Sequence, residues 1–170
     1  MKDVVNTVAF VAAASGSGKT TLIESLVKRL RGKGYRVGTV KHSVHEATFD
    51  RKGSDSWRFE RAGADVTVLA SRGRLDVFRA VENPSADEAL QAASSGTDIV
   101  LVEGFRDSPL PKIEVFRSDH SKELLFRRGE IKDTGFVAVA SDIPMDLEVP
   151  VLDLNDPDEV CDFIIRRFIE

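Results

Sequence analysis

The stretch AAASGSGKTT, from Ala12 to Thr21, decides the expected fold. It matches the phosphate-binding pattern G-x-x-x-x-G-K-[ST] at every fixed position but the first, where the chain has Ala13. In such a loop, successive backbone N–H groups point at phosphate oxygens, and the helix that follows offers its positive N-terminus. Position 13 is the bend from strand to loop, where alanine is tolerated if φ is negative. The stretch therefore predicts a site for the phosphates of a nucleotide.

The segments on either side of this loop have the patterns that the loop requires. Residues 5–13 are β-branched and almost continuously apolar, which is typical of a strand buried on both faces of a parallel sheet. After the loop, apolar residues recur at helical spacing until Gly32. A strand, a phosphate loop and a helix follow one another, so a glycine-rich turn that binds nothing is the weaker interpretation.

The rest of the chain alternates between strand and helix patterns. Strands are expected at 35–42, 65–71, 74–80, 98–105, 112–117, 136–142 and 149–154, with helices at 83–96 and from Asp156 onward. This order predicts an α/β fold, a mostly parallel sheet with helices on both faces and an edge hairpin. The 170 residues are expected to form a single nucleotide-binding domain, residues 1–170.

Composition excludes several classes of function. The formal net charge of −4 gives no basic footprint, so nucleic acid is not expected as a partner. The apolar run at 8–14 is too short to span a membrane and leads directly into the loop, so neither a signal peptide nor a membrane anchor is expected. The single cysteine, Cys161, fits a reducing compartment, which favours the cytoplasm.

The loop supplies the first candidate ligands. Lys19 is expected to reach the β and γ phosphates, Thr20 to ligate Mg²⁺ and Thr21 to bind the α-phosphate. The nucleotide-binding residues predicted here are Ser15, Gly16, Ser17, Gly18, Lys19, Thr20 and Thr21. A bound Mg²⁺ needs an acid at the end of a neighbouring strand, and Glu103 at the end of IVLVE is the candidate. Glutamate reaches further than aspartate, so Glu103 is also a candidate for orienting water in catalysis.

A polar segment past residue 40 offers more candidates at the same edge of the sheet. Lys41 and His42 follow a strand and could contact the γ-phosphate, which makes His42 a second catalytic candidate. His42 and His45 together are more typical of surface residues than of metal ligands. Asp50 is a candidate Mg²⁺ ligand and Asp55 a candidate switch residue, although both acids could equally cap the following helix.

The choice of base is less constrained. Asp142, after Ser141 at the end of a strand, could accept the two donors of guanine with one carboxylate. The chain contains no [NT]-K-x-D guanine signature, so spacing alone leaves GTP and ATP open. Arg127 and Arg128 could form the lid of a small-molecule kinase, which is the alternative function, although a solvated turn is favoured. The lone Cys161 argues against a metal-insertion GTPase.

Several longer strings together resemble one family. They are SGSGKTT, VGTVKHSVHE, DRKGSDSWRFERAGA, DIVLVEGFRDSPLPKIEVFR and VAVASDIP, and they extend over nearly the whole chain. In this order they resemble the MobB family of molybdopterin-guanine dinucleotide biosynthesis adaptor proteins. KH, GSDSWRFERAGA and VEGF are far more specific than the phosphate loop. The segment TFDRKGSDS departs from the family pattern because it lacks the proline of the DKPG version.

The resemblance implies a P-loop NTPase fold, binding of GTP and Mg²⁺, and weak intrinsic hydrolysis. It also implies a homodimer that assists a MobA-type guanylyltransferase, the enzyme that joins GMP to molybdopterin. The family's site segments fall on 15–21, Lys41, His42, Asp50, Asp55 and Glu103 of this chain.

Overall fold

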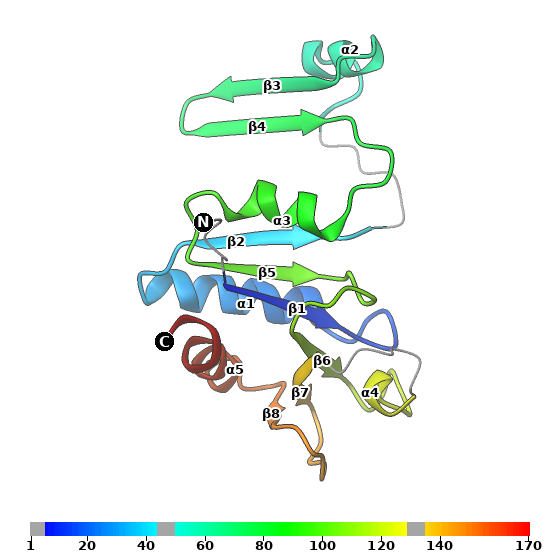
Figure 1. The fold of residues 1–170 in the computed structure, drawn as a ribbon, viewed down its shortest axis with the longest axis vertical. Coiled ribbons are helices and arrows are strands. Elements are labelled where there is room, and N and C mark those ends of the chain that lie inside the picture. The colour runs from blue at the N-terminus through cyan, green and yellow to red at the C-terminus, as the bar shows by residue number, and fades with distance from the viewer. Residues whose placement is uncertain (1–5, 44–49, 129–134) are drawn as a thin grey trace. The chain divides into compact units, whose positions relative to one another are not determined.

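The computed structural model describes residues 6–43, 50–128 and 135–170 (Figure 1). The chain divides into two compact units, one made of Met1–His42 and Ala86–Glu170 and the other of Ser43–Ser85. The single domain expected from the sequence stays a prediction.

The first unit is built on a six-stranded sheet with the order β2-β5-β1-β6-β7-β8, in which every neighbouring pair is parallel. The strands are β1 (Asn6–Val11), β2 (Val37–Lys41), β5 (Ile99–Glu103), β6 (Lys112–Phe116), β7 (Phe136–Ser141) and β8 (Val151–Asp153). From β1 the chain continues to β2, which lies on one side of β1 in the sheet, whereas β6 lies on the other side of β1. The carboxyl end of β1 is therefore at the topological switch point where α/β proteins bind ligands. The predicted α/β fold with a mostly parallel sheet is confirmed.

Alternate residues of the strands face two different helical layers. Val8 and Phe10 of β1 belong to the core under α1 (Lys19–Gly32) and α5 (Pro157–Ile164), which continues as the π-helix η1 (Ile165–Ile169). Ala9 packs on the opposite face with Leu90 and Ala93 of α3 (Ala86–Ser94). Further along that face, Val11 packs with α4 (Leu125–Arg128). Both faces of β1 are buried, as its continuous apolar sequence predicts.

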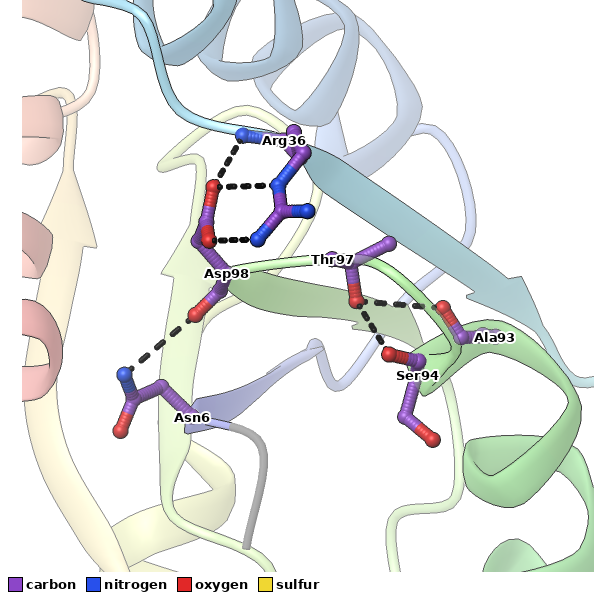
Figure 2. A network of polar contacts seen from close by, with 6 residues as sticks. All are labelled: Asn6, Arg36, Ala93, Ser94, Thr97 and Asp98. Atoms are coloured by element: carbon purple, nitrogen blue, oxygen red, sulfur yellow. Dashed lines mark hydrogen bonds and ion pairs between the residues drawn. The ribbon is translucent and has the colours of Figure 1, made fainter. Parts of the chain in front are cut away.

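A polar network joins the amino ends of three strands (Figure 2). The Asp98 carboxylate accepts hydrogen bonds from the backbone N and from the guanidinium of Arg36, with Oδ–N distances of 2.7 Å for the backbone N and 2.7 Å for Nη2. Asn6 Nδ2 donates to the Asp98 carbonyl at 3.3 Å. The Arg36 bonds, those of its side chain first, hold the pKa of Asp98 at about 2. Together the Arg36 and Asn6 bonds align the starts of β1, β2 and β5, so that the opposite ends of these strands meet at one edge.

The second unit contains a short helix and a hairpin. The helix α2 (Asp55–Arg61) is capped by the Ser54 hydroxyl, which accepts from Trp57 N at 3.3 Å. Strands β3 (Val66–Ser71) and β4 (Arg74–Arg79) form an antiparallel sheet of their own. The predicted hairpin is present, but within the described ranges it is not hydrogen-bonded to the edge of the six-stranded sheet. None of the helices described here is both long and apolar enough to cross a membrane.

Candidate functional site

The phosphate loop connects β1 to α1 with the backbone that its glycines permit. Gly16 and Gly18 have φ of 78° and 93°, in the left-handed region that favours glycine. Ala13 is not among the residues with positive φ, so alanine fits at the strand-to-loop bend as expected. Gly18 is the N-cap of α1 and offers no side chain to its first turn. The first N–H groups of the helix therefore remain available to an anionic ligand.

Lys19 lies over this loop. Its Nζ is 3.3 Å from Ser17 Oγ and 3.5 Å from the Ala14 carbonyl oxygen. Partial burial lowers the pKa of Lys19, Glu103 opposes this effect and Lys41 adds to it. A partly desolvated ammonium gains most from an anionic partner, which is what a phosphate would supply at this position.

Glu103, at the end of β5, joins two other predicted residues, Thr20 and Lys41, in one corner. Thr20 Oγ1 donates to Glu103 Oε2 at 2.9 Å, and Lys41 Nζ is 3.5 Å from Glu103 Oε1. The Glu103 side chain is only 17% exposed. A hydroxyl beside a carboxylate fits Mg²⁺, which takes one or two protein ligands and completes its shell with phosphate oxygens and water. The described residues contain no group of three His, Cys, Asp or Glu side chains that could hold a metal unaided.

His42 lies beside this corner, with its ring stacked on another side chain. Its ring centroid is 4.4 Å from that of Phe105, at an interplanar angle of 28°. The intervening Gly104 has φ of 102°, and a Cβ there would be 2.9 Å from His42 Cβ. Phe105 itself has φ of 49°, a conformation rare for a bulky residue and often found at functional sites. The strings KH and VEGF therefore form one packed contact, while the catalytic role of His42 stays a prediction.

The acids of the polar segment are held locally within the second unit. The Asp50 carboxylate accepts from Ser54 Oγ and Arg51 N at 2.6 Å each, and also from Ser56 Oγ. These donors, the two hydroxyls first, lower the pKa of Asp50. Asp55 lies in the first turn of α2 and pairs with Arg58 at 3.4 Å. The Mg²⁺ role of Asp50 and the switch role of Asp55 stay predictions, and His45 lies outside the described residues.

Asp142 follows β7 and is fixed in orientation by one neighbour. Its Oδ1 accepts from Ser118 N at 2.9 Å and its Oδ2 from Ser118 Oγ at 3.1 Å. A carboxylate has about four lone-pair sites, so one remains on each oxygen. The Ser141 hydroxyl is occupied in its own turn, donating to the Ile143 carbonyl at 2.7 Å. Of Ser141 and Asp142, only Asp142 keeps lone pairs that could accept hydrogen bonds from a nucleotide base.

Sequence reasoning missed Arg117 and His120, which lie in the turn after β6. A Cβ at Gly18 would be 3.7 Å from Arg117 Nη2, and one at Gly16 would be 3.2 Å from His120 Cε1. The available signal was the position of Arg117 at the carboxyl end of a strand, directly after β6, as Glu103 ends β5. Arg127 belongs to α4, and its side chain, like that of Arg128, lies outside the described part of the chain.

Comparison with known proteins gives a consistent result. The family model of molybdopterin guanine dinucleotide synthesis protein B, MobB, matches residues 7–142. The molybdopterin-guanine dinucleotide biosynthesis adapter protein of Escherichia coli K12 is 37% identical, over 97% of this chain and 94% of its own. The protein of the same name from Haemophilus influenzae is 38% identical, over 91% of this chain and 85% of its own.

A solved structure agrees with the sequence comparisons. The crystal structure of a MobB homologue from Bacillus stearothermophilus superimposes with a TM-score of 0.71 and 28% identity, covering 95% of this chain and 97% of its own.

Proposed function

Since this chain belongs to the MobB family of molybdopterin guanine dinucleotide synthesis proteins, we propose that it is a GTP-binding adaptor in that biosynthesis. In this proposal it binds GTP with Mg²⁺ in the cytoplasm and assists a MobA-type guanylyltransferase in attaching GMP to molybdopterin. The relatives named above are described as adapter proteins of molybdopterin-guanine dinucleotide biosynthesis, which supports an accessory role.

The observation that carries nucleotide binding is the 2.9 Å hydrogen bond from Thr20 to Glu103 beside an uncapped helix N-terminus. Lys19 and the backbone N–H groups of residues 15–21 would bind the phosphates. Thr20 and Glu103 would hold Mg²⁺, which would neutralise charge between the β and γ phosphates.

Weak turnover follows from what surrounds the two catalytic candidates. The Glu103 carboxylate is engaged by Thr20 and lies near Lys41, and the His42 ring is stacked on Phe105. Neither the Glu103 carboxylate nor the His42 ring is free to act as a general base toward an attacking water. Hydrolysis at a low intrinsic rate is therefore expected, as for a protein that holds GTP for a partner.

In this proposal, the Asp142 carboxylate selects guanine over adenine. Ser118 fixes its carboxylate and leaves one acceptor site on each oxygen, which matches the N1–H and N2–H₂ donors of guanine. Adenine presents an acceptor at N1 and would be repelled by the same carboxylate.

Thermal unfolding in the presence of nucleotides tests the proposal. With Mg²⁺, GTP at 100 times its Kd should stabilise the protein by about 2.7 kcal/mol, with a smaller effect from ATP at equal concentration. In Glu103→Gln, Mg²⁺ should no longer add to the stabilisation that GTP gives in EDTA. Glu148→Gln, which changes an exposed carboxylate in the segment before β8, is the matched control and should behave as wild type. Equal or greater stabilisation by ATP would disprove the guanine assignment.

A further inference from the structure

We propose that Arg117 is a phosphate-binding residue of this site and that it contacts the nucleotide from the flank opposite to Glu103. The inference rests on the proposed nucleotide binding and adds a cationic ligand that the phosphate-loop pattern does not contain.

The first support is the position of the guanidinium. A Cβ built on Gly18 would be 3.7 Å from Arg117 Nη2 and 3.9 Å from Nε, so the charged group lies against the glycine that begins α1. Gly18 borders the N–H groups that face the phosphates in a loop of this kind. An arginine fork at this point suits phosphate oxygens, because its donors match their spacing.

The second support is that the guanidinium has no carboxylate partner. Arg117 is half-buried, yet among all interactions of the described residues its side chain takes part in no hydrogen bond or ion pair. The Asp142 carboxylate, which follows β7, is engaged by Ser118 of the same turn and not by Arg117. A partly buried cation without a partner gains free energy when an anion arrives.

The third support is that the turn carrying Arg117 is held in place. The Arg117 carbonyl accepts from His120 N at 2.9 Å and from Ser121 N at 3.0 Å, which closes residues 117–121 into a turn. The link from Ser118 to Asp142 ties this turn to the end of β7. The His120 ring lies over Gly16, so the turn covers the loop at two glycines. Arg117 is therefore presented by a rigid support, which limits the entropy lost on binding.

The sheet order indicates which phosphates Arg117 reaches. Glu103 and Lys41 end β5 and β2, on one side of β1, while Arg117 follows β6 on the other side. In the proposed function, Mg²⁺ and the γ-phosphate would be bound on the first side. Arg117 is thus assigned to the α or β phosphate, which GDP and GTP share.

The test measures affinity for GDP and GTP by calorimetry in EDTA, so that Mg²⁺ does not contribute. Arg117→Gln should bind both nucleotides roughly ten- to a hundredfold more weakly, the loss expected for one charged hydrogen bond to phosphate. Arg117→Lys should recover part of the affinity. Arg31→Gln, in the last turn of α1, should bind as wild type. The unfolding temperature of the free protein should not change in Arg117→Gln, because no ion pair is lost.

The outcomes separate this inference from the proposed function. If wild type binds GTP and Arg117→Gln binds it equally, Arg117 is not a ligand, and the GTP proposal stands. A loss confined to GTP contradicts the assignment to the α or β phosphate. A lower unfolding temperature with unchanged affinities indicates a structural role and also overturns the inference. Wild type that binds neither nucleotide overturns both proposals.

Discussion

The Asp142 carboxylate is fixed in orientation by hydrogen bonds and still has acceptor sites for a ligand. Ser118 takes one lone-pair site of each oxygen, through its backbone N–H and its hydroxyl. The residual sites face away from these donors and keep a fixed spacing, which is what bidentate reading of guanine requires. A carboxylate without Ser118 would lose rotamer freedom on binding, and part of the affinity with it.

Asp142→Asn tests base reading at this residue. The amide can still bond to Ser118 but repels the N2–H₂ group of guanine, so GTP should bind on the order of a hundredfold more weakly. Xanthosine triphosphate, which has a carbonyl in place of that amino group, should be favoured instead. Affinities for GTP, ATP and xanthosine triphosphate measured by calorimetry decide the matter, with the exposed Asp119→Asn as control. Equal weakening of GTP and ATP would show that Asp142 acts only through the turn.

The site residues that could be predicted from the sequence are those that lie in a contiguous motif or at the end of a recognisable strand. Lys19 and Thr20 belong to a contiguous motif and Glu103 ends an apolar strand, so the contact between Thr20 and Glu103, 2.9 Å in the structure, could be anticipated. The place of Arg117 beside Gly18 could not be anticipated, because it depends on β6 being the neighbour of β1. Strand order is a property of the whole sheet and cannot be inferred from a short stretch of sequence.

At the scale of elements, the network around Asp98 should make stability depend on pH. Its folded-state pKa of about 2 is below the ordinary 3.8, so the ionised form is favoured by folding. The stabilisation is complete above pH of about 4 and is lost as pH falls toward 2. Asp98→Asn should therefore lower the unfolding temperature by a few degrees at pH 7, with the difference from wild type vanishing near pH 2. Melts from pH 7 to pH 2 would show this.

A matched variant isolates the contribution of the network. Asp65→Asn removes an exposed carboxylate that is not part of this network and should leave the melting curve at each pH close to wild type. If the difference between Asp98→Asn and wild type persisted unchanged at pH 2, the ion pair with Arg36 would not be its source.

The sequence predicted the strands but neither the short helix α4, where a turn was favoured, nor how β6 tolerates its charged residues. The β6 sequence KIEVF alternates, yet Lys112 and Glu114 are fully buried. Lys112 Nζ donates to the Ser108 carbonyl at 2.6 Å, and Glu114 accepts from Leu125 N at 2.7 Å. The backbone of a loop and of α4 therefore supplies hydrogen-bond partners to both charged side chains. An alternating charge pattern normally indicates that one face of a strand is exposed to solvent, but β6 is covered on both faces.

At the scale of the whole molecule, the hairpin of the second unit has an open face that carries four exposed apolar side chains. Thr67 and Leu69 lie on one face of β3, where they are 7% and 40% exposed. On the other face Val66, Val68, Leu75 and Val77 are 46%, 54%, 66% and 56% exposed. A two-stranded sheet is marginally stable by itself, and contiguous apolar side chains of this kind mark an interface. The homodimer that the family resemblance implies stays a prediction, and this open face is the surface predicted for its interface.

Val68→Asp tests this prediction, because two-fold symmetry brings the same surface from both copies into the interface. Val68 lies opposite Val77 in the middle of the open face, so the substitution would bury an unpaired carboxylate from each copy. The dimer should dissociate with a Kd raised on the order of a hundredfold or more, measured by sedimentation across protein concentration. Leu69→Asp changes the next residue of the same strand, which is 40% exposed on the opposite face, and should leave the dimer intact. A Val68→Asp protein that remains dimeric, or a wild type that is monomeric throughout, would contradict the prediction that the open face binds a second copy.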